Sequence, residues 1–137
     1  MRHVFVDADY WVALLNPKDS LHLAAINITQ NLGQVILVTT YWVLLELFNV
    51  IIIKARPLRK RVVNAFEALR KNPNVIILPA TRDSFEEGVE LLSKRLNRRY
   101  SLPDCISICE IKNRAITDVL SADRHFKQEG INTLLRR

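Results

Sequence analysis

The chain has 137 residues, of which 49% are hydrophobic and 25% charged, and its formal net charge is +6. This composition excludes an intrinsically disordered protein, and the length predicts a single domain over residues 1–137. The excess of basic residues favours a polyanionic partner, such as nucleic acid or an anionic lipid surface.

Short apolar runs separated by longer amphipathic segments predict that strands and helices alternate along the chain. In chain order, the expected strands are residues 3–6, 35–38, 75–78, 117–121 and 131–135. The expected helices are residues 9–15, 19–32, 41–53, 57–71, 81–96, 101–113 and 124–129. This alternation predicts an α/β fold in three layers, with a central parallel sheet of four to five strands between helices.

Polar residues at the expected helix ends set the helix boundaries. Asp19 or Ser20 is expected to cap the second helix, and Gly33 to end it. Ser101 and Asp104 have the spacing of a capping box at the start of the sixth helix. The apolar stripe of the fifth helix is expected to consist of Phe85, Val89, Leu92 and Leu96.

One apolar segment, residues 35–53, is long enough to span a bilayer. Glu46 lies within it, which would be costly in lipid, and the polar pair at 39–40 indicates a break between a strand and a helix. Asp7 interrupts the first apolar run, so no signal peptide is expected. We therefore predict that the protein has no membrane partner.

The chain has two cysteines, Cys105 and Cys109, at a spacing that places them on one face of a helix. This arrangement is unsuited to a disulfide, and the three histidines are too scattered to complete a zinc site. Both cysteines are expected to be small core residues. A chain without a disulfide framework is typical of the cytoplasm.

Most acidic residues, Glu129 among them, lie in polar stretches typical of helix surfaces. Four others interrupt apolar sequence that should be buried: Asp7, Glu46, Asp104 and Asp123. An unpaired carboxylate in such a place is costly, and several together repel one another. A bound divalent cation removes this cost, and Mg²⁺ prefers carboxylates together with water and phosphate oxygens. Asp7 and Asp123 each follow a strand, so we expect them at one edge of the sheet.

Three of the four acids also have a purely structural interpretation. Asp7 and Asp123 could each cap the helix that follows, and Asp104 could serve only the capping box. Glu46 has no such alternative, because it is expected in mid-helix between large apolar residues. It is therefore the strongest single indication of a functional acidic site.

Four stretches of the chain follow one another as VFVDADYWVALLNPKDSLH, TTYWVLLELFN, YSLPDCISI and ITDVLSADRHFKQEGI. In order and spacing they resemble the PIN domain, in particular the toxin ribonucleases of type II toxin–antitoxin pairs. The resemblance covers essentially the whole chain, and its most specific part is LSADRHF with SLPDCIS upstream. It implies a PIN-like α/β/α fold and a nuclease that hydrolyses single-stranded RNA with Mg²⁺ or Mn²⁺.

The same resemblance implies a role for each acid. Asp7, Glu46, Asp104 and Asp123 correspond to the catalytic, metal-binding acids of the family. Asp7 and Asp104 would bind the metal directly, and Glu46 and Asp123 would complete the site. The implied reaction is an in-line attack on a phosphodiester that leaves a 5′-phosphate.

Three further residues are expected to support or modify this site. Thr40 and Ser107 carry hydroxyl groups where the family often has polar support, although Ser107 could equally be a residue of helix packing. Asp9 stands where the family usually has a small polar residue. It either adds a fifth acid to the site or caps a helix and points to solvent, and we favour the second interpretation.

Two basic clusters lie in the sequence: Lys54, Arg56, Arg59, Lys60 and Arg61, and Lys94, Arg95, Arg98 and Arg99. Each could hold RNA phosphates or form a solvated helix face. Arg98, Arg99 and Arg124 are the candidate RNA-binding residues, and His125 could contact the substrate. His125 is not expected to act as a general base.

The resemblance also implies a homodimer and a small cognate antitoxin that blocks the cleft. Leu44, Leu47, Phe48 and Ile51 exceed what one core face needs, which would fit an interface. The main alternative function is a non-catalytic RNA- or protein-binding PIN-like module. A phospho-acceptor receiver domain is disfavoured because no Asp ends the third strand, and DNA flap nucleases are usually much longer.

Overall fold

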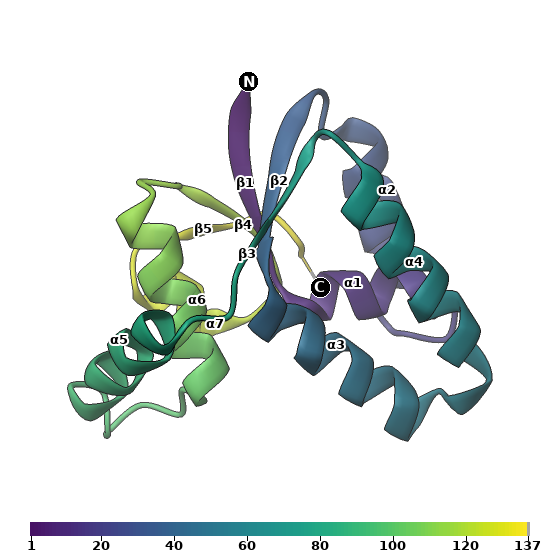
Figure 1. The fold of residues 1–137 in the computed structure, drawn as a ribbon. Helices are drawn as coiled ribbons and strands as arrows, with labels where there is room; N and C mark the ends of the chain where they lie inside the picture. Colours follow the sequence, from purple (N-terminus) through teal and green to yellow (C-terminus); the bar gives the residue numbers. More distant parts are fainter. Residues whose placement is uncertain (137) are drawn as a thin grey trace.

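The computed structural model describes residues 1–136 and contains a parallel sheet of five strands (Figure 1). The strands are β1 (Arg2–Val6), β2 (Val35–Thr40), β3 (Val75–Leu78), β4 (Asp118–Leu120) and β5 (Asn132–Thr133). Their order across the sheet is β3-β2-β1-β4-β5, and every neighbouring pair is parallel. The structure therefore confirms the α/β class and the parallel sheet predicted from the sequence.

Helices cover the sheet in two groups. They are α1 (Ala8–Leu15), α2 (His22–Asn31), α3 (Tyr41–Lys54), α4 (Arg59–Lys71), α5 (Arg82–Ser93), α6 (Leu102–Asn113) and α7 (Arg124–Gln128), with a short 3₁₀ turn η1 (Arg56–Leu58) before α4. Helices α1 to α4 lie on one side of the strands, and α5 and α6 lie on the other (Figure 1). Right-handed crossovers produce this division when the chain winds outward from β1 in both directions. Within residues 1–136, no helix is long and apolar enough to cross a membrane.

The winding of the sheet changes direction between β1 and β4. Strand β1 pairs with β2 on one side and with β4 on the other. The segments that follow β1 and β4 therefore lead to opposite faces and leave a crevice at the carboxyl ends of these strands. The backbone N–H of Asp7 donates to the carbonyl of Leu120 at 3.2 Å, so the pairing continues up to this edge. Asp7 and Asp123 thus lie where the strand order predicts a ligand site.

The predicted boundaries of α2 and β5 are among those that differ from the structure. Helix α2 begins at His22, and its N-cap Leu21 makes no side-chain capping bond. Asp19 instead accepts a hydrogen bond from the N–H of Leu21 at 2.9 Å, within the turn before the helix, so the predicted cap at Asp19 or Ser20 is wrong. Gly33 ends the helix with φ +76°, as expected. Strand β5 is shorter than predicted and covers only residues 132–133.

The predicted apolar stripe of α5 is correct only for Leu92, which is partly buried against the core. Phe85 is 40% exposed, Val89 43% and Leu96 77%, and the helix ends before Leu96. The buried residues of α5 are the small ones, Ser84 and Gly88. A Cβ atom on Gly88 would meet the side chain of Ile106 and lie 3.2 Å from its backbone nitrogen. Small residues rather than large apolar ones therefore allow α5 to pack closely against α6.

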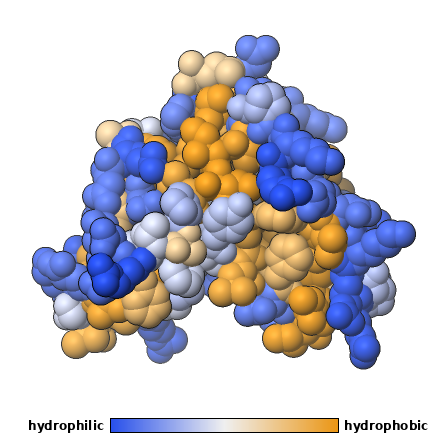
Figure 2. All heavy atoms as spheres, in the orientation of Figure 1, coloured by the Kyte–Doolittle hydropathy of each residue, from blue (hydrophilic) through white to orange (hydrophobic). Residues whose placement is uncertain are grey.

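The residues of α3 that are predicted to form an interface lie in the core or pack against it instead. Leu44, Leu47 and Ile51 are at most 3% exposed and belong to the core, and Phe48 packs against it, so these residues are not surplus to the fold. The exposed apolar residues of α3 include Leu45 at 56% and Ile53 at 78%. Figure 2 shows apolar surface over α3 and over β2 and β3.

Candidate metal centre

A cavity of about 320 Å³ opens at the carboxyl ends of β1 and β4. Six acidic residues line it: Asp7, Asp9, Asp19, Glu46, Asp104 and Asp123. They come from the start of α1, the turn before α2, the middle of α3, the start of α6 and the residue before α7. The structure therefore brings together the four acids singled out in the sequence, although they are far apart along the chain, and adds Asp9 and Asp19 to them.

Burial and mutual repulsion disfavour the charged forms of these acids. Asp7 is 5% exposed, and its pKa is raised well above the usual range by burial and then by the carboxylates of Asp9 and Glu46. The pKa of Glu46 is raised to about 7, mainly by burial, with repulsion from Asp104 and Asp123 adding to it. Without a cation, this cavity holds negative charge at a cost in stability.

The structural roles considered for three of these acids are only partly found. Asp7 and Asp123 both occupy N-cap positions, but neither side chain makes a capping hydrogen bond. Asp104 does close the capping box, because its Oδ2 accepts from the N–H of Ser101 at 2.8 Å. Its other oxygen, Oδ1, lies 3.3 Å from Nε2 of His125. Asp104 thus combines the cap with a place in the acidic cavity.

Asp9 points into the protein, so the prediction of a solvent-facing cap is wrong. Its Oδ2 accepts hydrogen bonds from the hydroxyl of Ser121 at 3.1 Å and from the N–H of Ala122 at 2.9 Å. The Ser121 hydroxyl in turn accepts from the N–H of Asp123 at 3.1 Å. Burial raises the pKa of Asp9 to about 6, and the Asp123 carboxylate adds to this effect. Asp9 therefore fastens the segment that carries Asp123 to helix α1.

His125 is a member of the cluster that sequence reasoning did not place there. Asp7, Asp123 and His125 each offer a ligand atom, and these three atoms lie within 4.8 Å of one another. The His125 side chain is 12% exposed. Its position two residues after Asp123 was the available signal, because Asp123 is the N-cap of α7 and His125 lies in the first turn of that helix.

These residues fit a divalent cation. Within residues 1–136, Oδ1 of Asp9 and Nε2 of His125 are buried and have no hydrogen-bond partner. Buried polar atoms without a partner are costly, and carboxylate oxygens and an imidazole nitrogen are suitable metal ligands. The cluster is therefore an acidic site that can bind a metal ion.

The two hydroxyl residues expected to support the site do not line its cavity. Thr40 is the N-cap of α3, where its Oγ1 accepts from the N–H of Val43 at 3.0 Å. It therefore fixes the start of the helix that carries Glu46. Ser107 is 1% exposed within α6, in agreement with the alternative interpretation as a residue of helix packing.

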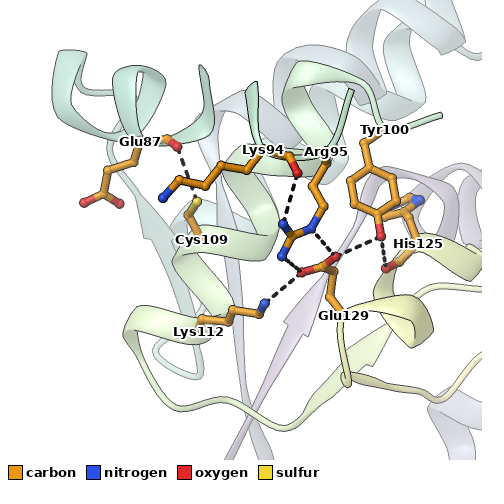
Figure 3. Close-up of polar contacts among 8 residues, drawn as sticks. All are labelled: Glu87, Lys94, Arg95, Tyr100, Cys109, Lys112, His125 and Glu129. Carbon is orange, nitrogen blue, oxygen red and sulfur yellow. Dashed lines mark hydrogen bonds and ion pairs between the residues drawn. The ribbon is translucent and has the colours of Figure 1, made fainter. Parts of the chain in front are cut away.

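Behind the site, Glu129 holds three segments together (Figure 3). Its carboxylate is paired with Arg95 at 2.9 Å and with Lys112 at 2.8 Å, and the hydroxyl of Tyr100 donates to it at 3.0 Å. The Glu129 side chain is only 5% exposed, so its assignment to a helix surface is wrong. Its partners come from the segment after α5 and from α6, and the sequence pattern around Glu129 gives no sign of these distant contacts.

A Glu129→Gln variant is expected to lose about 2 kcal/mol of stability at pH 7, because two charge-assisted contacts are lost. The partners of Glu129, first Arg95, lower its pKa to about 2, against an ordinary value of 4.5. Their stabilisation is thus fully present above about pH 4.5 and is lost as the pH falls towards 2. Thermal melts of the parent and variant should differ at pH 7 and converge in acid.

Glu90→Gln is the matched control for this prediction. Glu90 is 70% exposed and, among residues 1–136, pairs only with the exposed Lys94, so its replacement should change stability little. A Glu129→Gln melting curve that coincides with the parent's at pH 7 would contradict the role given to Glu129.

The three candidate RNA-binding arginines lie together next to the acids. Arg98, Arg99 and Arg124 line a second cavity, which shares Asp123 with the acidic one. Arg95 and Lys94, from the same basic cluster, are engaged with Glu129 and Glu90. The other cluster, residues 54–61, lines neither of these two cavities. Its Lys54 instead lines a separate, apolar cavity.

Comparison with known proteins identifies relatives along the whole chain. The chain is 27% identical over 132 residues to the 23S rRNA-specific endonuclease VapC20 of Mycobacterium tuberculosis, covering 93% of this chain and 94% of the relative. The crystal structure of VapC20, described as a Sarcin-Ricin loop cleaving toxin, superimposes with a TM-score of 0.81 at 26% identity, covering 93% and 95% of the two chains. No family model matches the chain.

A more distant solved structure shares the fold. FitAcB from Neisseria gonorrhoeae superimposes with a TM-score of 0.67 at 15% identity and covers 95% of both chains. FitAB bound to a DNA fragment gives a TM-score of 0.69 at 13% identity, covering 95% of this chain and 92% of the other. The likeness to VapC20 thus extends to both sequence and fold along nearly the whole chain, which has the PIN-like α/β fold and is similar to a VapC ribonuclease.

Proposed function

We propose that the protein is an Mg²⁺-dependent endoribonuclease that hydrolyses phosphodiester bonds of single-stranded RNA, and that it is the toxin of a toxin–antitoxin pair. The observation that carries this proposal is the cavity lined by Asp7, Glu46, Asp104 and Asp123 at the switch point of the sheet. Mn²⁺ would serve as an alternative ion, since it accepts similar oxygen ligands. The cysteines of the described chain are free, which suits the cytoplasm.

Each acid has a proposed role. Asp7 and Asp104 hold the metal directly, and Glu46 and Asp123 complete the site around it. When bound, the divalent cation would lower the pKa of water and neutralise charge that develops on the phosphate. Asp9 and Ser121 keep Asp123 in place. The products would be an RNA with a 3′-hydroxyl and one with a 5′-phosphate.

The RNA substrate is proposed from a relative that is similar along nearly the whole chain. VapC20 is named for its action on 23S rRNA and on the Sarcin-Ricin loop. A single-stranded loop in a structured RNA offers the accessible backbone that a shallow acidic cavity requires. We therefore infer that 23S rRNA is the first substrate to assay.

Two protein partners belong to this proposal. FitAB is a solved complex of the same fold, and we infer a cognate antitoxin for this chain as well. We also infer a homodimer, because α3 exposes Leu45 and Ile53 next to Phe85 of α5 around an apolar cavity of about 420 Å³. Exposed apolar surface of this kind is typical of protein interfaces.

Cleavage of 23S rRNA and of a labelled single-stranded RNA, with Mg²⁺ and with EDTA, tests the proposed function. The protein should cut both with Mg²⁺, lose the activity in EDTA and regain it when Mg²⁺ or Mn²⁺ is returned in excess. RNA binding without cleavage under every metal condition would favour the alternative, a non-catalytic PIN-like module. Cleavage that persists in EDTA would contradict the role given to the acids.

A further inference from the structure

The arginines near the acidic cavity differ in what they contact. Arg95 is committed to Glu129 at 2.9 Å. Among residues 1–136, Arg98, Arg99 and Arg124 are in no ion pair with an acidic side chain, and all three are exposed. Their charge is thus available to a ligand.

These three arginines share one cavity of about 630 Å³. Its wall consists of Asn97, Arg98, Arg99, Tyr100, Ala122, Asp123, Arg124, His125 and Gln128. The volume is within the range of small-ligand pockets, about 300–1,000 Å³. Because Asp123 also lines the acidic cavity, a chain that crosses the acids can continue directly into this one.

The cavity is held open by contacts behind it. It lies between the segment 97–100 and helix α7, and Tyr100 joins the two. The Tyr100 hydroxyl donates to Glu129 at 3.0 Å and lies 3.5 Å from the carbonyl of His125, as Figure 3 shows. A ligand therefore meets walls whose separation is already fixed, which lowers the cost of ordering them.

The side chains that line this cavity suit a nucleotide, which carries both a phosphate and a base. Arginine donates paired hydrogen bonds to phosphate oxygens. Asn97 and Gln128 each offer a donor and an acceptor, which is the combination that the edge of a nucleobase requires. A free anion would use only the arginines and would leave the two amides without a role.

We propose that this cavity is a nucleotide subsite, in which Arg98, Arg99 and Arg124 contact backbone phosphates and Asn97 and Gln128 contact a base of the RNA beside the scissile bond. The inference rests on the proposed ribonuclease function. It makes this cavity, rather than the basic cluster at 54–61, the source of RNA affinity and of preference for a base next to the cut.

Binding of a fluorescein-labelled single-stranded RNA dodecamer in EDTA tests the subsite, because cleavage is blocked there. Replacing Arg98, Arg99 and Arg124 together by Ala should weaken binding about 100-fold. The dependence of log affinity on log salt concentration should become shallower by about 2, since each phosphate contact on a single strand contributes about 0.7. The matched control removes Arg56, Arg59 and Lys60, and should weaken binding less than about threefold.

Equal losses in the two triple variants would overturn the subsite, since they would indicate a response to net charge alone. Unchanged RNA affinity in the Arg98, Arg99 and Arg124 variant would also overturn it and would point to an acidic protein partner instead. Both variants should melt like the parent. Because this readout needs no cleavage, it remains valid if the Mg²⁺ assay finds no ribonuclease activity.

The base contact has its own test. Four RNAs that differ only in the nucleotide next to the cut should bind the parent with unequal affinity, and Asn97→Ala with Gln128→Ala should reduce the spread to within about twofold. A spread that the double variant leaves unchanged would overturn the base contact.

Discussion

An Asp7→Asn variant is expected to cleave RNA roughly 10³-fold more slowly than the parent, while unfolding at a higher temperature in EDTA. The loss of activity follows from removing a carboxylate oxygen that we propose as a metal ligand, on a residue that lines the cavity and is 5% exposed. The gain in stability follows because this carboxylate is buried beside Asp9 and Glu46, which raise its pKa. Mg²⁺ should raise the melting temperature of the parent and have little effect on the variant.

The same variant also tests how the stability of the metal-free protein depends on pH. Asp7 and Glu46 have raised pKa values in the folded protein, about 7 for Glu46, so the fold retains protons that the unfolded chain releases near pH 4. The stability of the metal-free parent should therefore fall as the pH rises from about 4 to 7. Thermal melts in EDTA across this range should show the fall in the parent and a smaller fall in Asp7→Asn.

Asp83→Asn is the control for both measurements. It removes the same charge as Asp7→Asn, but from an exposed residue in the first turn of α5. It should cleave and melt like the parent. An Asp7→Asn variant that cleaves as fast as the parent would show that the reaction takes place elsewhere in the protein.

The largest effect on stability is expected at Gly88. Its replacement by Val places two methyl groups and a Cβ atom where the backbone of Ile106 already lies 3.2 Å from the Cβ position. Overpacking of this kind costs about 3 kcal/mol, because α6 must move away from α5. Gly88→Ala should lose less, since the better helix propensity of Ala returns about 1 kcal/mol.

Urea unfolding measures both Gly88 variants. Ala68→Val is the matched control, because it adds methyl groups to an exposed position of α4 and should change stability by less than about 0.5 kcal/mol. A Gly88→Val protein as stable as the parent would contradict the close packing of α5 and α6. Since α6 carries Asp104, the Val variant should also bind Mg²⁺ more weakly.

Sequence reasoning succeeded where one local signal decides the structure. Asp7 and Asp123 follow apolar strands, so the parallel sheet alone brings them to one edge. Glu46 interrupts an apolar helix, and only a site on its partly buried face explains it. The predicted grouping of these acids with Asp104 in one cavity follows from the fold.

Prediction from the sequence failed where the role of a residue depends on a partner that is distant along the chain. Asp9 contacts Ser121 and Ala122, which are more than a hundred positions away, so a local pattern could only suggest a helix cap. Glu129 has a polar neighbourhood in sequence, yet Arg95 and Lys112 enclose it in space. Hydrophobic spacing in α5 likewise could not reveal that Gly88 is the point of contact with α6.

The order of the strands has a consequence during protein synthesis. Strand β4 inserts beside β1, which is made much earlier, and Asp123 follows β4. A nascent chain that has not yet emerged beyond Asp123 lacks one wall of both cavities. Chains that stop before this segment should therefore lack the proposed activity.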